Sequence, residues 1–341
     1  MVKLFVTIFI AISASTVLLA PAIAAPESTA PQQNAILLLS SDDGALYQDF
    51  IDAFRNRLNE LHDKPVTALD IRILGQPYSL DNPALVITVG SQATATVLRH
   101  KNAAQNPPIL ATLIPRPAFA LLADNPKAQR ALASGKLSAV YLDQPFARQI
   151  NLIKLLLPNA TAIGSILGPA SQHQKAELAH SAREHGLTLN IALLTSDEPD
   201  PLPALRTLLS PEQASDVILA LPDRAVYNRF TIRPLLLATF RQNVPVFAYS
   251  ESLVGAGAVA GVYSTPEQLG WQAAETAYAF LQQPAAERKL PAPAYPVYFK
   301  VSVNSRISDL LGLNPPAAAA LELRMEAMES DENSWQARGA K

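Results

Sequence analysis

The chain has 341 residues, 49% hydrophobic and only 16% charged, a composition typical of a well-packed globular protein that is long enough for two domains. Its formal net charge of −2 provides no electrostatic footprint for nucleic acid or for an anionic membrane surface. The absence of cysteine excludes disulfides, thiol catalysis and lipid anchoring through an N-terminal cysteine, and only 13 glycines make a phosphate-binding loop a weak prospect.

The first 24 residues have the layout of a secretory signal peptide. Lys3 supplies the positive charge, Leu4–Ala20 is the apolar region, and Ala22-Ile23-Ala24 places small residues at the cleavage site. The apolar run is close to the ~20 residues that a membrane-spanning helix needs, so an uncleaved anchor is the alternative. The small-residue site and the polar run Glu27–Asn34 favour cleavage. We therefore expect a protein that works outside the cytoplasm, with no stable membrane insertion after cleavage.

Short apolar runs alternate with longer amphipathic segments in the first half of the chain. The segment Ala45–Leu61 predicts a helix, since Phe50, Phe54 and Leu58 fall on one stripe at helical spacing. A second helix is expected from Ser91. The expected strands of this half are Ala35–Ser40, Ile71–Leu74, Ala84–Gly90, Ile109–Ile114 and Ser138–Leu142.

The second half repeats this rhythm. The expected helices are Arg148–Leu157, Ser171–His185, Leu202–Leu209, Ile232–Gln242 and Pro266–Leu281. The expected strands and extended segments are Thr161–Leu167, Thr188–Leu194, Val217–Leu221, Pro245–Tyr249, Ala258–Tyr263 and Pro296–Val303.

Continuous apolar strands separated by helices predict parallel sheets that are covered on both faces. One open sheet of about ten strands is possible, but two lobes explain the length better. The fold class is therefore α/β, with two Rossmann-like lobes and a cleft between them. We expect a signal peptide at 1–24, an N-terminal lobe at 34–142 plus about 251–290, a C-terminal lobe at 143–250 plus about 291–314, and a flexible tail at 315–341.

No catalytic, metal or cofactor motif emerges from the sequence. There is neither a G-x-S-x-G elbow nor a G-x-x-x-x-G-K-[ST] loop. His173 and His180 share one face of a predicted helix, but their spacing separates them by ~10 Å, too far for one zinc ion. The run Gly255–Gly261 looks like a dinucleotide fingerprint, but Ser250–Val254 separates it from the preceding strand, and we interpret it as a flexible return between lobes. We expect a protein that is not an enzyme and has no cofactor.

Polar residues follow the apolar strands at their carboxyl ends, where open α/β sheets bind ligands. Ser91 can cap the following helix, whose free N–H groups face an anion such as a carboxylate. Each of these residues alone also fits an ordinary loop or cap. The candidate ligand-binding residues are Ser41, Asp42, Ser91, Gln92, Arg116, Asp223, Arg224, Tyr227, Tyr249, Ser250 and Glu251.

Long stretches of the chain resemble the ABC-transporter substrate-binding proteins of the tryptophan/tyrosine type, which have the type I periplasmic-binding-protein fold. The resemblance extends from about Ala35 to Leu313. The matching stretches are NPALVITVGSQATATVL (Asn82–Leu98), INLIKLLLPNATAIGSILGP (Ile150–Pro169), ASDVILALPDRAVYN (Ala214–Asn228), NVPVFAYSESLVGAGAVAGVYSTPEQLGWQAA (Asn243–Ala274) and PVYFKVSVNSRISDLLGL (Pro296–Leu313).

Three positions depart from the family pattern. Arg116-Pro117 stands where the family usually has Asp-Pro, and Asp223-Arg224 stands where it often has Asp-Asn. The Gly-Asn-Val-Thr-Gly crossover is replaced by Gly135–Ala139. An arginine in place of an acidic residue reverses the charge preference of a cleft, so a ligand with more anionic character is consistent with both arginines.

The resemblance implies a periplasmic solute-binding protein whose lobes close over an amino-acid-like or anionic organic solute for an ABC importer. In such a site, Ser91 and Gln92 would anchor a carboxylate, and the aromatic rings would stack on a planar ligand. Charge selection would come from Asp42, Asp223 and Arg224, and stacking from Tyr227 and Tyr249.

The same closure also fits a ligand sensor for a membrane receptor or kinase without a transport role. The expected partners are a small-molecule ligand and either an ABC permease or a membrane sensor protein. We expect no nucleic acid partner and a monomeric protein.

Overall fold

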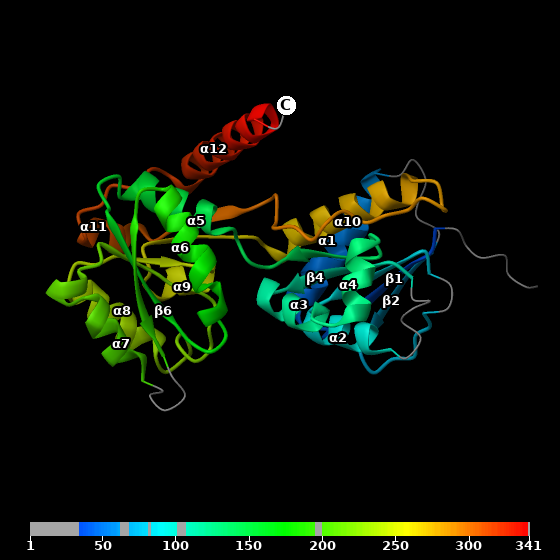
Figure 1. Cartoon of the computed structure of the whole chain (residues 1–341), viewed down its shortest axis with the longest axis horizontal. Coiled ribbons are helices and arrows are strands. Elements are labelled where there is room, and N and C mark those ends of the chain that lie inside the picture. Colours follow the sequence, from blue (N-terminus) through cyan, green and yellow to red (C-terminus); the bar gives the residue numbers. More distant parts are fainter. Residues whose placement is uncertain (1–33, 62–67, 81–82, 101–106, 195–199, 340–341) are drawn as a thin grey trace, which may run out of the picture. The chain divides into compact units, whose positions relative to one another are not determined.

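A computed structural model describes residues 34–61, 68–80, 83–100, 107–194 and 200–339. The predicted signal peptide lies outside these residues. From residue 34 onward the chain builds two mostly parallel sheets with helices packed on both faces of each, which confirms the predicted α/β class (Figure 1). Within the described ranges, no helix has both the length and the apolar character needed to cross a membrane.

The first sheet has the strand order β2-β1-β3-β4-β5, with every pair parallel. The carboxyl ends of its strands therefore meet at one edge, which is where ligands bind such sheets. The strands are β1 (Ile36–Ser40), β2 (Leu69–Ile73), β3 (Leu85–Val89), β4 (Ile109–Ile114) and β5 (Leu137–Tyr141). The helices of this lobe are α1 (Ala45–Leu61), α2 (Ser91–Arg99), α3 (Arg116–Ala123), α4 (Pro126–Ala133) and α10 (Pro266–Gln282).

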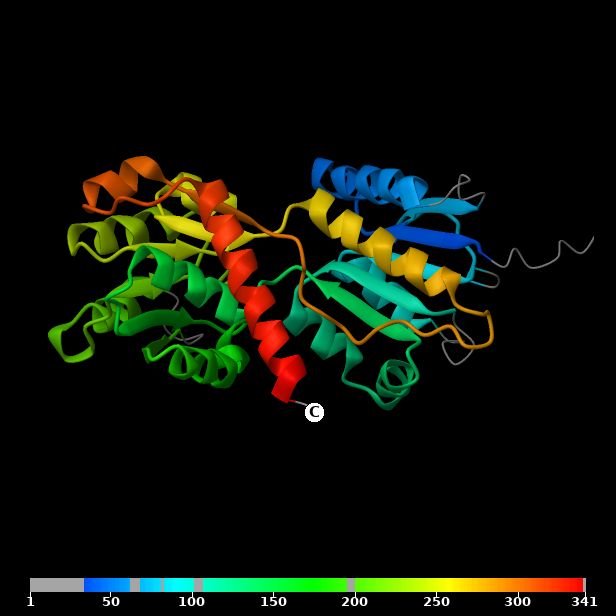
Figure 2. The same cartoon turned by 90° about the horizontal axis from the view of Figure 1, so that it is seen from above.

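Alternate side chains of the central first-sheet strands enter two separate hydrophobic cores. Leu38 packs in the core that contains Phe54 of α1, whereas Leu37 packs in the core that contains Val97 of α2. Helix α10 lies along α1, although the two are far apart in the sequence (Figure 2). Gly270 permits this approach, since a Cβ there would lie 2.7 Å from the carbonyl oxygen of Phe50. The chain thus returns to the first lobe to complete its core.

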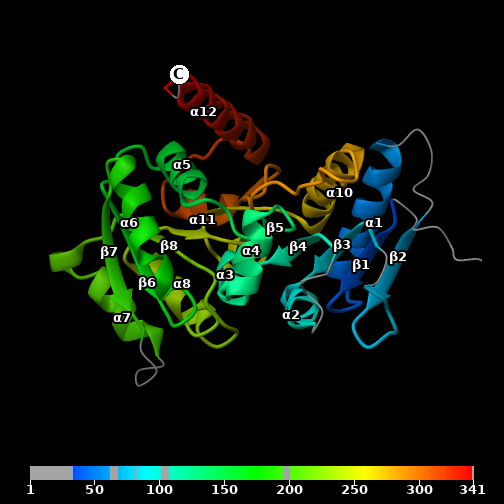
Figure 3. The same ribbon diagram turned by 45° about the vertical axis from the view of Figure 1, so that its right-hand side comes forward.

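The second sheet has the order β11-β10-β9-β8-β6-β7, and β11 is antiparallel to β10 while the other pairs are parallel. The neighbouring strands β8, β6 and β7 are labelled in Figure 3. The strands are β6 (Ala162–Leu167), β7 (Thr188–Leu193), β8 (Val217–Leu219), β9 (Val246–Ala248), β10 (Ala260–Tyr263) and β11 (Lys300–Val303). The helical segments are α5 (Phe146–Leu156), η1 (Gln172–Gln174), α6 (Lys175–Glu184), α7 (Pro201–Leu208), η2 (Pro211–Gln213), α8 (Ile232–Arg241), α9 (Glu251–Ala256) and α11 (Ser305–Leu310).

The expected strand at Ala258–Tyr263 is confirmed by β10, but the residues before it form helix α9 and not a flexible return. Ser250 caps α9 by accepting a hydrogen bond from the backbone N–H of Leu253, and Gly257 ends the helix with φ of 130°. The chain then enters β10, which pairs with both β9 and β11. The lobe boundary expected at about residue 251 lies before these elements, and the chain leaves the second sheet only after Tyr263.

The C-terminal segment contains helix α12 (Ala318–Gly339), where the sequence predicts a flexible tail at 315–341 with at most one marginal helix. Leu321 and Met325, one helical turn apart, are buried in the core of the second lobe. Glu322 accepts a hydrogen bond of 2.7 Å from the backbone N–H of Val301 in β11. The Ala- and Glu-rich sequence does not predict this docking, because the buried apolar face of the helix is so short.

Three segments, here named the crossovers, connect the two lobes. The first is Leu142–Pro145 between β5 and α5, and the second is Ser264–Thr265 between β10 and α10. The third is Tyr295–Phe299, which follows the bridge between Ala294 and Val140 and leads into β11. The first two follow the carboxyl ends of β5 and β10, and the third follows the bridge to Val140 near the carboxyl end of β5. The crossovers therefore bring polar residues toward one region.

Candidate functional site

A cavity of about 240 Å³ lies where the crossovers meet the carboxyl ends of strands from both sheets. It draws on the segments after β4, β5, β8, β9 and β10. This is the edge where the sequence predicted ligand binding. The lining residues are Pro115, Leu142, Asp143, Gln144, Phe146, Gln149, Gln174, Leu221, Pro222, Tyr249, Ser250, Val262, Tyr263, Ser264 and Tyr295.

Aromatic rings and one carboxylate give the cavity its chemical character. Phe146, Tyr249, Tyr263 and Tyr295 all line it. Asp143 is the charged residue among the lining side chains. Burial raises the pKa of the Asp143 carboxyl, and the hydrogen bond that it accepts from the backbone N–H of Arg116 only partly offsets this effect.

Arg116 lies beside the cavity at the start of α3, but its guanidinium is already neutralised. It forms a close ion pair with Glu177 of α6 and donates a hydrogen bond of 2.7 Å to the hydroxyl of Tyr295. That hydroxyl in turn donates to the other carboxylate oxygen of Glu177, at 3.0 Å. We call these three residues the Arg116 cluster. Burial and the nearby Glu177 carboxylate raise the pKa of the Tyr295 phenol. The positive charge of Arg116, which the sequence suggested for binding an anion, is therefore paired with Glu177.

Two of the predicted ligand-binding residues, Tyr249 and Ser250, line the cavity directly. Tyr227 lies behind Tyr249, with the ring centroids 6.2 Å apart and the planes at 65°. Burial is the main cause of the raised pKa of both phenols. Tyr227 thus fixes the orientation of Tyr249 rather than lining the cavity itself. Glu251 begins α9. The pKa of Tyr263 is raised to about 12, first by burial of its phenol and second by the Glu251 carboxylate.

Asp223 follows β8 and is buried, with its carboxylate committed to the neighbouring turn. It accepts hydrogen bonds of 3.0 Å from the backbone N–H groups of Ala170 and Ser171, and one of 2.9 Å from the Ser171 hydroxyl. The adjacent Arg224 is exposed. Neither residue is part of the cavity lining. These hydrogen bonds stabilise the Asp223 carboxylate and give the residue a structural role in the turn.

Ser41, Asp42, Ser91 and Gln92 lie together at the carboxyl edge of the first sheet, away from the cavity lining. The hydroxyl of Ser41 accepts a hydrogen bond of 2.9 Å from the backbone N–H of Ala93, so it caps α2 from a neighbouring loop. Asp42 accepts a 2.9 Å hydrogen bond from the N–H of Gly44. The ligand-binding role of these four residues stays a prediction.

The cavity also contains residues that the sequence did not single out, among them Asp143, Gln144 and Tyr295. The signal for the first two was available, because Leu142–Pro145 was already expected to cross between the lobes. Tyr295 sits in a proline-rich run without periodicity, and nothing in the sequence pointed to it. Within the described ranges, no group of three metal-ligating side chains comes together.

Comparisons with known proteins identify the family. The family model described as "ABC transporter substrate binding protein" matches residues 72–306. No curated protein matches the chain in sequence.

Several solved structures are similar. A ligand-free, open substrate-binding protein with adhesive properties from Clostridium difficile has a TM-score of 0.62 at 18% identity, covering 83% of this chain and 96% of that one. A conserved domain protein from Vibrio cholerae has a TM-score of 0.53 at 20% identity, covering 86% and 98%. An ABC domain in complex with L-Trp from Streptococcus pneumonia has a TM-score of 0.53 at 18% identity, covering 83% and 96%.

The likeness to the solved structures shows a shared fold, and it agrees with the predicted type I periplasmic-binding-protein architecture. The family model spans well over half of the chain, including most strands of both sheets. This protein therefore belongs to the ABC transporter substrate-binding protein family.

Proposed function

We propose that this protein is a periplasmic solute-binding component of an ABC importer, and that it captures an amino-acid-like solute whose ammonium group faces Asp143. The observation that carries the proposal is the cavity wall, which combines one carboxylate with phenol and phenyl rings. Aromatic faces and a carboxylate both attract an ammonium group. Membership of the substrate-binding family supports an ABC permease as the partner.

The charges near the cavity favour an ammonium-bearing solute over an anionic one. Among the residues that the structure describes, the cavity lining holds a carboxylate but no lysine or arginine. Arg116, which lies beside the cavity, is paired with Glu177. An anion would therefore enter next to Asp143 without a free cation to offset the loss of its hydration. An ammonium group would instead favour the charged form of Asp143, which burial disfavours.

Polar groups around the rings can orient such a solute. Gln149 and Gln174 carry amides that can donate and accept hydrogen bonds. The ring of Tyr249 is braced by Tyr227, so an aromatic or planar body could lie against a wall of fixed orientation. A cavity of about 240 Å³ lies just below the ~300 Å³ at which ligand sites usually begin, which suits a small metabolite.

A binding screen on the purified protein tests this proposal. Free L-amino acids, their N-acetyl derivatives and short dicarboxylic acids are compared by calorimetric titration. We expect binding by some free amino acids and at least tenfold weaker binding by the matching N-acetyl derivatives, because acetylation removes the ammonium charge. Binding of dicarboxylates alone, or of none of these solutes, would contradict the proposal.

A pair of matched variants locates the ammonium site. Asp143→Asn removes the cavity carboxylate but keeps its shape, and we expect the affinity for the best amino acid to fall by tenfold or more. Asp309→Asn makes the same change at an exposed position on α11, and its affinity should equal that of the wild type. Equal affinities of the two variants would place the ammonium group elsewhere.

A further inference from the structure

Arg148 is a buried arginine that connects α5 to the C-terminal helix α12. Its side chain is only 5% exposed and forms a two-point ion pair with Glu329, in which Nη2 donates to Oε2 at 2.7 Å and Nε donates to Oε1. The guanidinium carbon also lies 4.3 Å from the centre of the Phe299 ring. A two-point pair fixes direction as well as distance, so the guanidinium has one preferred orientation.

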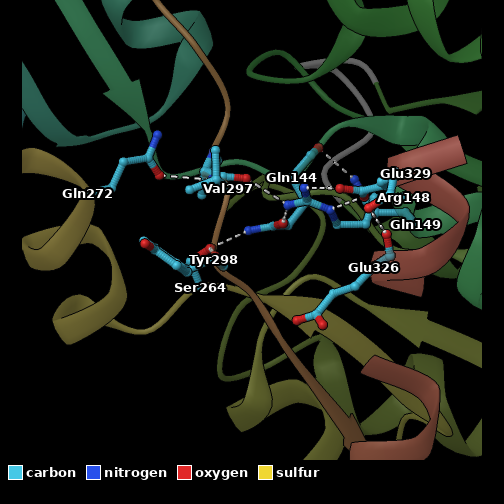
Figure 4. A network of polar contacts seen from close by, with 11 residues as sticks. Gln144, Arg148, Gln149, Ser264, Gln272, Val297, Tyr298, Glu326 and Glu329 are labelled. Carbon is cyan, nitrogen blue, oxygen red and sulfur yellow. Dashed lines mark hydrogen bonds and ion pairs between the residues drawn. The ribbon is translucent and has the colours of Figure 1, made fainter. Parts of the chain in front are cut away.

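The third nitrogen of Arg148 reaches two of the crossovers. Nη1 donates to the side-chain oxygen of Gln144 at 2.7 Å and to the carbonyl oxygen of Pro296 at 2.8 Å. The amide of Gln144 donates to the Ser264 hydroxyl at 2.8 Å, and this hydroxyl donates to the carbonyl oxygen of Tyr298 at 2.6 Å. One continuous network therefore joins all three crossovers (Figure 4).

Helix α12 presents Glu329 to this network through a regular spacing. Leu321 and Met325 are buried in the second lobe, and Glu329 follows at the same four-residue interval. Residues four apart lie on one helical face, so the two apolar side chains dock the helix and the carboxylate reaches Arg148. Glu326, in contrast, is exposed and points away from Arg148 (Figure 4).

We propose that α12 is a clamp on the crossovers, and that Glu329 and Arg148 are positioning residues that set how far the lobes open without a ligand. Gln144 and Ser264 line the cavity, so the clamp also fixes part of its polar wall. The matched family region ends at residue 306, so α12 lies beyond it. The inference rests on the proposed function only in treating the crossovers as a hinge.

The physical reason for the clamp is the cost of leaving a buried guanidinium without acceptors. In Glu329→Gln the amide keeps one acceptor oxygen but places an NH2 donor where the second carboxylate oxygen was, so either Nε or Nη2 loses its acceptor and the guanidinium loses its charge partner. The side chain would then turn toward water. This movement withdraws Nη1 from Gln144 and Pro296, so that the first and third crossovers are no longer tied together.

Distance measurements between spin labels on the two lobes test the clamp. The chain lacks cysteine, so Asn59→Cys on α1 and Arg206→Cys on α7 give two unique, exposed labelling sites. In the ligand-free protein we expect Glu329→Gln to broaden the distance distribution toward longer values. Glu326→Gln, with the same charge change on the same helix, should leave it unchanged. Equal distributions for the two variants would overturn the proposal.

Hydrogen exchange supplies a second measurement on the same variants. We expect the amides of residues 142–149 to exchange about tenfold faster in Glu329→Gln than in Glu326→Gln. Equal exchange rates would overturn the proposal.

Should Glu329→Gln not fold, Glu329→Asp replaces it, with Glu326→Asp as its control. A broader distribution for the former supports the clamp, and equal distributions overturn it. Neither measurement contains a solute, so a failure of amino-acid binding leaves the result standing.

Discussion

Two arginine–glutamate pairs flank the crossovers, and their surroundings differ sharply. Arg116 joins α3 of the first lobe to Glu177 of the second, and both side chains are 38% exposed. Arg148 joins α5 to Glu329 of α12, and the arginine side chain is 5% exposed while that of Glu329 is 26% exposed. Both guanidinium groups also lie over an aromatic ring of the third crossover. The same kind of ion pair thus occurs once at a solvent-exposed contact between the lobes and once among the crossovers with its arginine buried.

The difference in exposure assigns the two pairs different tasks. An exposed ion pair contributes about 0–1 kcal/mol and is screened by salt, so it can form and break as the lobes move. Breaking a buried pair by removing one partner costs about 3–5 kcal/mol, because the remaining charge stays without compensation. The Arg116 cluster is therefore suited to a reversible contact between lobes, and the Arg148 pair to a permanent connection.

The largest expected effect is on the buried pair. Arg148→Ala removes the ion pair with Glu329. It also removes the hydrogen bonds that Nη1 donates to the side chain of Gln144 and to the carbonyl oxygen of Pro296. We expect the free energy of unfolding to fall by about 3 kcal/mol in urea titrations. Arg306→Ala, an exposed arginine on α11, should change it by less than about 0.5 kcal/mol. Equal losses in the two variants would remove the distinction between the pairs.

A smaller effect, of opposite sign, is expected at Asp143, which accepts the backbone N–H of Arg116. Burial raises the pKa of this carboxyl in the folded protein above its unfolded value. The folded state therefore binds the proton more tightly, and Asp143 lowers stability as pH rises through these two pKa values. Asp143→Asn removes this penalty, and the free energy of unfolding at pH 7 should rise by about 1 kcal/mol.

The pH dependence provides the check on this prediction. Below the ordinary pKa of an aspartate, the carboxyl is protonated in both states, so the advantage of Asp143→Asn should disappear near pH 3. Urea titrations at both pH values measure the difference. The exposed Asp309→Asn should show no such pH-dependent gain. A loss of stability at pH 7 would mean that the charged carboxylate is favoured in the folded state.

The sequence predicted the sheets well because their signal is local. Strands such as β1 and β3 are buried along their entire length and read as continuous apolar runs. Helix α3 was missed even though Pro117 stands in its first turn, a position typical of a helix start. The sequence places Arg116 after a strand as a candidate ligand-binding residue, and it does not predict the helix because a single short helix has little periodicity.

The candidate site was predicted only in part, for a different reason. The rule that ligands lie at the carboxyl ends of strands found Tyr249 and Ser250. The rule could not show that Asp223 accepts hydrogen bonds from Ser171 or that Arg116 forms an ion pair with Glu177, because both pairings join residues distant in the chain. The pairing of Arg148 with Glu329 is more distant still, and it depends on the docking of α12. Composition provides no access to such contacts.

The smallest expected effect tests the exposed pair. Glu177→Gln removes the charge partner of Arg116 but keeps a hydrogen-bond acceptor for Tyr295. We expect the free energy of unfolding to fall by about 0.5 kcal/mol in dilute buffer. In 1 M NaCl, where the screening length is about 3 Å, the difference from the wild type should vanish. The exposed Glu287→Gln serves as the control for loss of a negative charge. Arg148→Ala should keep most of its effect at both salt concentrations, because salt screens a pair with a buried guanidinium much less than an exposed pair. A salt-independent loss in Glu177→Gln would mean that the Arg116 cluster is as permanent as the Arg148 pair, and that the lobes are joined at two fixed points rather than one.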